Sequence, residues 1–281
     1  LERQFLHEEE LLAFESEAIS DRDEIRKDPS RAIKRKLASI KKRLEPRPID
    51  KIVTSLYDGI RISNKLCRLE GISKAYDEHV LFRNVSFDII KEDRVAIIGP
   101  NGCGKTTLLR ILAGNELPDS GEVKWEKTIE CSYYNQVLEE LDPNDSVTHI
   151  LNITSLTFTA PRKLVNRFMS LMQFSEMDIE QKIKTLSGGQ RARVALAKCL
   201  LSGSSVIVLD EPTNHLDLTS TQVMERALLH FPGAVVVASH DRFFIDKLAN
   251  RLIIFDGSET LKEFGGNWTL YEMGFEYSKT T

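Results

Sequence analysis

The run GPNGCGKTT, residues 99–107, has the composition of a loop that binds phosphate groups. It fits the spacing G-x-x-x-x-G-K-[ST] with Gly99, Gly104, Lys105 and Thr106. Glycines let the backbone turn tightly, so that successive N–H groups point inward toward an anion. Lys105 would place a positive charge beside the β and γ phosphates of a nucleotide, and the Thr106 hydroxyl would bind Mg²⁺. A glycine-rich turn without a ligand is the alternative.

Two further apolar runs end in side chains that suit hydrolysis of a phosphate chain. The run SSVIVLDEP, residues 204–212, ends in Asp210 and Glu211. Asp210 is placed to hold Mg²⁺ through water, and Glu211 to orient or deprotonate the attacking water. The run VVVASHD ends in His240, which would reach the γ-phosphate. The alternatives are an ordinary acidic turn beside a proline and a structural histidine.

The elements that must position these groups can be read from the same runs. RVAII, residues 94–98, predicts a buried strand, and KTTLLRILAG predicts a helix that ends at Gly114. Residues 234–239 predict another buried strand. Ligands of open parallel sheets collect at the carboxyl ends of the strands, and a helix N-terminus favours an anion. We therefore expect the three groups to meet at one edge of a sheet.

A second short motif, LSGGQ at residues 186–190, heads an apolar helical pattern. With it, the chain resembles the nucleotide-binding domain of the ATP-binding cassette (ABC) family over residues 66–271. In the family's terms GPNGCGKTT is the Walker A loop, Gln136 in YYNQ the Q-loop glutamine, and LSGGQ the signature. VIVLDEP is Walker B, NHLD at residues 214–217 the D-loop, and His240 the switch histidine.

This resemblance implies an α/β fold of the P-loop NTPase type with a mixed β core. It implies an ATPase domain at residues 66–275, with a helical signature subdomain at about residues 137–200, preceded by a charged α-helical linker at residues 1–60. ATP and Mg²⁺ would be the cofactors, and ATP would be hydrolysed to ADP and phosphate with Glu211 and His240 as catalytic residues.

The family's ligand positions carry over residue by residue. The metal would be held by Thr106, Gln136 and Asp210. Tyr76 would stack on adenine, and this stacking would contribute on the order of 1 kcal/mol to binding. The alternative is that a tyrosine at a strand end only packs at the edge of the hydrophobic core. The nucleotide-binding residues would be Tyr76, Gly99, Asn101, Gly102, Cys103, Gly104, Lys105, Thr106, Thr107, Gln136, Ser187, Gly188, Gly189 and Gln190.

The signature explains why one chain carries two cradles. In such domains the signature of one copy caps the nucleotide held by another copy. Ser187, Gly188 and Gly189 would thus face the γ-phosphate of a second cassette, either upstream in the same chain or in a second copy.

Two positions depart from the family pattern. In KEDR, residues 91–94, Glu92 stands where the family usually has glycine, so the sequence predicts a turn that avoids a positive φ. Cys103 stands where alanine or serine is common, and a thiol beside phosphates suggests sensitivity to alkylation.

Composition limits the class of protein. The 281 residues are 41% hydrophobic and 28% charged, enough for one α/β core of about two hundred residues plus an extension. No apolar run is long enough for a membrane span and no signal peptide is visible. The four cysteines lack C-x-x-C spacing, so reduced thiols and a cytoplasmic location are predicted. The chain begins with leucine, and we expect it to be a piece of a longer protein.

The first fifty residues are polarised in charge. Residues 25–51 hold eleven basic and three acidic residues, and apolar positions 33, 37, 40 and 44 have helical spacing. The pattern predicts an amphipathic helix with a cationic face. It would either contact RNA phosphates or pack on the domain as an ordinary solvated helix.

Three segments favour the ABC-F branch, whose members carry two cassettes, lack membrane domains and act on the ribosome. They are TNHLD, SHDRFFID and FGGNWTLYE. The basic helix occupies the place of that branch's interdomain linker, which reaches toward tRNA, and the segment between Gln136 and Leu186 lacks a long insertion. Both features predict the second cassette of a protein that regulates translation, with ribosome, rRNA or tRNA as partners.

Two rival interpretations remain open from sequence. An ATPase subunit of a membrane ABC transporter would use the same motifs and dock its helical segment on a transmembrane partner. A nucleotide-gated scaffold without hydrolysis is disfavoured because Glu211 and His240 are both present.

Overall fold

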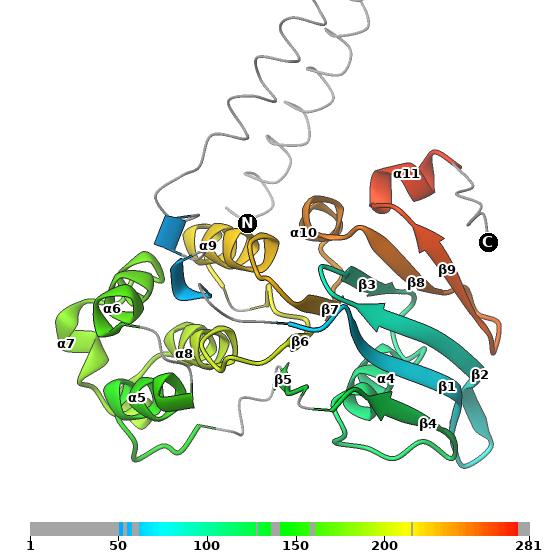
Figure 1. Ribbon diagram of the computed structural model, residues 1–281, viewed down its shortest axis with the longest axis horizontal. Coiled ribbons are helices and arrows are strands. Elements are labelled where there is room, and N and C mark those ends of the chain that lie inside the picture. Colours follow the sequence, from blue (N-terminus) through cyan, green and yellow to red (C-terminus); the bar gives the residue numbers. More distant parts are fainter. Residues whose placement is uncertain are drawn as a thin grey trace, which may run out of the picture. The chain divides into compact units, whose positions relative to one another are not determined.

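The computed structural model describes residues 51–52, 55–57, 62–127, 129–135, 141–157, 161–214 and 216–274 (Figure 1). The predicted linker at residues 1–60 lies almost wholly outside this part of the chain, as does Gln136. Those two assignments therefore stay predictions, together with the limits of the ATPase domain and its helical subdomain.

Two sheets form the β core. Six strands lie in the order β5-β6-β7-β3-β8-β9, with β9 antiparallel to β8 and the other neighbours parallel. Three antiparallel strands form the second sheet in the order β2-β1-β4. The predicted mixed β core is thus confirmed. The strands are β1 (Lys65–Tyr76), β2 (His79–Ile90), β3 (Arg94–Ile98), β4 (Ser120–Trp125), β5 (Cys131–Tyr134), β6 (Val206–Asp210), β7 (Ala234–Ala238), β8 (Arg251–Phe255) and β9 (Leu261–Gly265).

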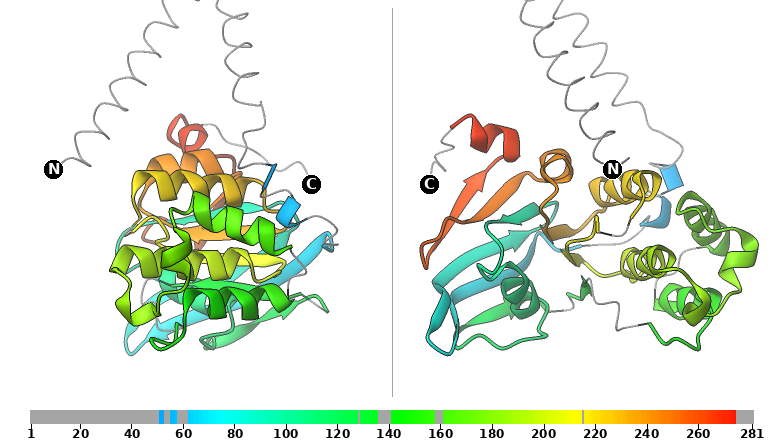
Figure 2. Two further views of the ribbon diagram at one scale, coloured as in Figure 1. Left: turned by 90° about the vertical axis from the view of Figure 1, so that its left-hand side faces the viewer. Right: turned by 180° about the vertical axis from the view of Figure 1, so that it is seen from behind.

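Helices cover the six-stranded sheet in two groups. Helix α4 (Lys105–Leu112) packs on β6 and β7 from the side of the three-stranded sheet. On the other side, α5 (Val147–Thr157), α6 (Arg162–Leu171), α7 (Glu176–Ile179), the 3₁₀ turn η1 (Ile183–Thr185) and α8 (Gly188–Leu200) form a helical layer with α9 (Leu218–Leu229). The left view of Figure 2 shows this layer in front of the strands. Helices α10 (Arg242–Leu248) and α11 (Trp268–Glu272) follow β7 and β9.

The central strands are buried on both faces, which is why they read as continuous apolar runs. Every residue of β3, β6 and β7 is buried. Alternate residues face opposite ways: Val95 and Ile97 join the core shared with α4, whereas Ala96 and Ile98 join the core shared with the helical layer. The strands predicted at residues 94–98 and 234–239 are therefore confirmed.

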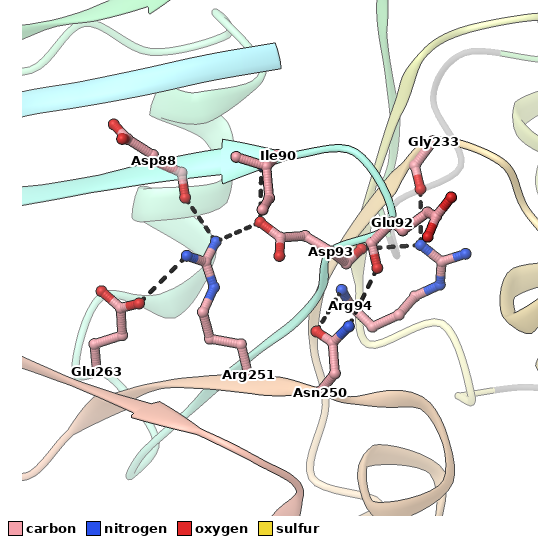
Figure 3. Close-up of polar contacts among 9 residues, drawn as sticks. All are labelled: Asp88, Ile90, Glu92, Asp93, Arg94, Gly233, Asn250, Arg251 and Glu263. Carbon is pink, nitrogen blue, oxygen red and sulfur yellow. Dashed lines mark hydrogen bonds and ion pairs between the residues drawn. The ribbon is translucent and has the colours of Figure 1, made fainter. Parts of the chain in front are cut away.

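The turn between β2 and β3 contradicts the expectation for Glu92. Its φ is 67°, in the left-handed region that the sequence was expected to avoid. The conformation costs about 1 kcal/mol for a residue with a Cβ. Figure 3 shows what holds it: the Asn250 amide donates to the Glu92 carbonyl over 3.2 Å and accepts from the Arg94 N–H over 2.9 Å.

The same turn is fixed by two arginines at the amino-terminal edge of the sheet, Arg94 buried and Arg251 largely buried. Arg251 donates to Asp93 Oδ2 over 2.7 Å and to the Asp88 carbonyl over 2.6 Å (Figure 3). Arg94 donates to the carbonyls of Gly233 and Phe231, just after α9. Burial lowers the pKa of Arg94 to about 10, still high enough for it to stay charged at neutral pH. These contacts fix the edge opposite the predicted site.

Tyr57 anchors the segment before β1 on the cassette, and we expect Tyr57→Phe to destabilise the chain. The buried Tyr57 hydroxyl donates to the Leu200 carbonyl over 2.8 Å, at the end of α8. Without the donor, a buried helix-end carbonyl loses a partner, which costs about 1–2 kcal/mol. Urea unfolding would measure the effect, with Tyr271→Phe, at an exposed tyrosine, as the control. Equal stability of Tyr57→Phe and the wild type would show that the bond contributes nothing.

Candidate functional site

The predicted groups meet in one pocket at the carboxyl edge of β3, β6 and β7. The cavity is about 640 Å³. Three loops supply its polar wall, because β3 leads into the glycine-rich loop, β6 into Asp210 and Glu211, and β7 into His240. Its lining consists of Tyr76, His79, Leu81, Asn101, Gly102, Gly104, Lys105, Thr106, Thr107, Asp210, Glu211, Asn214 and His240.

The glycine-rich loop is shaped by glycines that other residues could not replace without strain. Gly99 has a φ of 154°, and a Cβ added there would lie 2.5 Å from the Phe255 Cβ. Gly104 has a φ of 109° and is the N-cap of α4. The loop thus delivers its backbone N–H groups to the start of a helix, where an anion is favoured.

Lys105 is buried at the first turn of α4 and points back into the loop. Its ammonium donates to the carbonyls of Gly99 and Pro100, both over 2.9 Å. These bonds use two of three donors, so the third is left to meet an anion in the pocket.

Asp210 ends β6 inside the pocket, beside Thr106. Burial raises the pKa of the Asp210 carboxyl, and a hydrogen bond from Thr106 opposes that shift. Within the described residues no three His, Cys, Asp or Glu side chains converge on a metal site of their own. A carboxylate and a hydroxyl next to a phosphate cradle nevertheless fit Mg²⁺, which is commonly bound by one or two carboxylates together with substrate phosphates.

Glu211 is held in an unusual backbone conformation. Its φ is 49°, and its N–H donates to the Ala238 carbonyl of β7 over 2.8 Å. The backbone N–H of His240 donates to Glu211 Oε2 over 3.2 Å, and His240 Nε2 lies 3.6 Å from Glu211 Oε1. Burial raises the pKa of Glu211 above its usual value. The two predicted catalytic residues are therefore in direct contact. The backbone of Glu211 is in a strained conformation, and its side chain lines the pocket.

The far end of the pocket is formed by Tyr76, His79 and Leu81 around the β1–β2 hairpin. Tyr76 is 46% exposed, and a stacking surface must be accessible. His79 and Leu81 were not predicted as site residues. The signal available was their place at the start of the strand that follows Tyr76 across a tight turn.

Two predicted loop residues do not line the pocket. Gly99 is part of the loop but packs against Phe255 and not against the pocket. Cys103 packs beside it, because its Sγ lies 3.1 Å from the position that a Cβ on Gly99 would take. Cys103 is half-buried, and this burial raises the pKa of its thiol. The expected sensitivity to alkylation is weakened, because the reactive form of cysteine is the thiolate.

The signature residues lie outside this pocket, at the start of α8. Ser187 is the N-cap: its hydroxyl accepts from the Gln190 N–H over 3.2 Å, and Gln190 Oε1 accepts from the Ser187 N–H over 2.9 Å. The side-chain oxygen of Gln190 therefore takes part in capping α8. Ser187 and Gly188 are exposed, and a Cβ on Gly188 would meet nothing within 4 Å in the described part of the chain. Gly189 is half-buried beside them.

Comparison with known proteins gives the context of this geometry. A family model described as ABC transporter matches residues 82–214. The energy-dependent translational throttle protein EttA of Escherichia coli K12 is 37% identical over 229 residues, which are 79% of this chain and 40% of that protein. EttA of Mycobacterium tuberculosis is 36% identical over 220 residues, covering 76% of this chain and 39% of that protein. The chain thus spans about two fifths of the length of these curated relatives.

Solved structures agree on the fold. The RNase-L inhibitor is 26% identical with a TM-score of 0.61 over 79% of this chain and 44% of that one. A dimeric ATP-binding cassette bound to ADP and phosphate is 22% identical, with a TM-score of 0.60 over 71% of this chain and 98% of that one. The fold predicted from the motifs is confirmed. Each helix in the described residues is too short or too polar to cross a membrane.

Proposed function

The chain belongs to the ABC family of ATPases as a cassette of the ABC-F type, and from this premise we propose that it binds and hydrolyses ATP to regulate translation on the ribosome in the cytoplasm. The observation that carries the proposal is the pocket, which gathers the glycine-rich loop, Asp210, Glu211 and His240 in a chain similar to a translational throttle protein.

The phosphate chain of ATP would lie on the loop of residues 99–107. Backbone N–H groups at the start of α4 and the third Lys105 donor hold the β and γ phosphates. Thr106 and Asp210 would hold Mg²⁺, with Gln136 as a further ligand, and the bound ion neutralises charge on the phosphates. Glu211 orients the attacking water and takes its proton, and His240, 3.6 Å from Glu211, contacts the γ-phosphate.

Two cassettes would close face to face around each nucleotide. Ser187 and Gly188 lie exposed outside this chain's own pocket, so they are available to a second cassette. The open space above Gly188 allows another chain's nucleotide to come close to the backbone. ATP binding closes the pair and hydrolysis reopens it, so the nucleotide times the closed state.

The basic helix predicted within residues 25–51 would contact ribosomal RNA or tRNA when the pair is closed. Replacing Lys34, Arg35, Lys41 and Lys42 with alanine should therefore weaken ribosome binding. For each phosphate that a side chain no longer neutralises, the slope of log affinity against log salt should become shallower by about 1. Co-sedimentation with purified ribosomes at several salt concentrations measures both effects.

A matched control removes four cations from the cassette instead. Arg83, Lys124, Lys247 and Lys262 have exposed side chains that each pair with a carboxylate of the cassette, and their replacement should leave the salt slope unchanged. The same slope for the wild type and the helix variant would contradict an RNA contact and leave the helix as a solvated element.

The transporter alternative is less favoured. The curated relatives that are 36–37% identical to this chain are named translational throttle proteins. The match to the Escherichia coli protein, at 37% identity, covers 79% of the chain.

A further inference from the structure

The exposed ring at the far end of the pocket is held by a residue outside the pocket. The Tyr76 hydroxyl donates to Glu116 Oε1. Glu116 lies between α4 and β4 and is not part of the pocket lining. Although Tyr76 is 46% exposed, the orientation of its ring is therefore set by a carboxylate forty residues further along the chain.

Lys74 fixes both the ring and the carboxylate. Its ammonium lies over the Tyr76 ring, 5.4 Å from the centroid, and 3.3 Å from Glu116 Oε1. It also donates to the Leu117 carbonyl over 2.9 Å and to Asp119 Oδ1 over 3.1 Å. The Lys74 side chain is only 12% exposed, and all three of its donors are engaged by the Leu117 carbonyl, Asp119 and Glu116.

Backbone contacts lock the loop that carries Glu116 onto β1. The Ala75 N–H donates to Asp119 Oδ2 over 2.7 Å, and the Asp119 N–H donates to the Ser73 carbonyl over 2.9 Å. The hydrogen bonds that Lys74 donates to Asp119, and then to Glu116, raise the pKa of Lys74, which keeps the ammonium charged. The loop between α4 and β4 is therefore held against the strand that ends in Tyr76.

An aromatic ring fixed in advance binds a flat ligand better than a free one. A mobile tyrosine side chain loses rotamer freedom when a base stacks on its ring, and this loss of entropy weakens binding. A ring that is already fixed does not lose that freedom on binding. With the ammonium over one face, the opposite face is left for a base, in the usual offset stacking.

We propose that Glu116 and Lys74 are positioning residues that hold Tyr76 as the stacking surface for the nucleobase of ATP. The inference rests on the proposed function, because it assigns the base end of the same site. Since neither residue lines the pocket, both should act on the base and leave binding of the phosphates unaltered.

The test compares two ligands on the 281-residue chain, ATP and inorganic tripolyphosphate, each with Mg²⁺. Tyr76→Ala should weaken ATP binding about fivefold, the usual contribution of one stacked ring. Glu116→Ala and Lys74→Met should weaken ATP binding about threefold, because the ring then loses its rotamer freedom only on binding. Tripolyphosphate binding should not change in any of these variants. Lys124→Met, at a lysine paired with Glu70 and Glu122, is the control and should change neither ligand.

A double-mutant cycle separates positioning from a general effect on the loop. Once Tyr76 is alanine, Glu116→Ala should have no further effect on ATP binding, because the ring it holds is gone. Glu116→Gln keeps an acceptor for the tyrosine hydroxyl and should recover part of the affinity.

Three results would overturn the inference: equal weakening for both ligands, additive effects in the Tyr76→Ala background, or unchanged ATP affinity in both single variants. A wild-type chain that binds neither ligand would instead overturn the proposed function, and the inference with it.

Discussion

Lys105→Ala is expected to lower ATP affinity about 100-fold, which corresponds to about 3 kcal/mol. The ammonium is buried at the start of α4, so its charge acts on a phosphate with little screening by water. The substitution also removes the bonds to the Gly99 and Pro100 carbonyls that hold the loop closed on itself. Isothermal titration calorimetry with ATP measures the change.

The matched control for this variant is Lys262→Ala. Lys262 is an exposed lysine paired with Asp256 over 2.7 Å, and it is not part of the pocket lining. Its replacement should leave ATP affinity unchanged. If Lys105→Ala bound ATP as tightly as the wild type, the phosphate cradle would have to lie elsewhere on the chain.

Glu211→Gln is expected to lower the rate of ATP hydrolysis about 10²- to 10⁴-fold, the usual contribution of a general base. Glutamine keeps the size of the side chain and an acceptor for the His240 N–H, which lies 3.2 Å from Glu211 Oε2. ATP affinity should therefore change little. Phosphate release and ATP titration on the same sample separate chemistry from binding.

The burial of Glu211 also predicts how the rate of ATP hydrolysis depends on pH, and a second buried glutamate serves as a control. Because the pKa of Glu211 is raised and the base acts when deprotonated, wild-type activity should fall as pH is lowered through that pKa. The fall should disappear in Glu211→Gln. Glu225 is equally buried and also has a raised pKa, but it pairs with Lys247 away from the pocket, so Glu225→Gln should retain both rate and profile. Wild-type turnover in Glu211→Gln would mean that another group is the base.

Sequence predicted the parts of the fold in which one local rule decides the structure. RVAII became β3 over residues 94–98, because a short apolar run that leads into a glycine-rich turn is typical of a strand buried on both faces. The positions of Lys105, Asp210 and His240 after three apolar runs predicted that they meet at one edge of the sheet. They do so because neighbouring parallel strands have their carboxyl ends at the same edge.

The rest depended on contacts between distant residues. Glu92 adopts the left-handed conformation because Asn250, 158 residues away, holds its carbonyl. Glu211 adopts it with its N–H bonded to Ala238 on the neighbouring strand. Local preference disfavours both conformations, and only the assembled sheet explains them. The contact between Tyr76 and Glu116 likewise follows no spacing rule.

We propose that ATP binding places this protein on the ribosome. Sucrose-gradient sedimentation of native extract, from cells whose protein carries Glu211→Gln, tests this proposal when ATP is either in excess or withheld. We expect the protein to migrate with ribosomes when ATP is present and to leave them when ATP is omitted. Recovery with membranes under both conditions would instead indicate a transmembrane partner and rule out ATP-dependent binding to the ribosome.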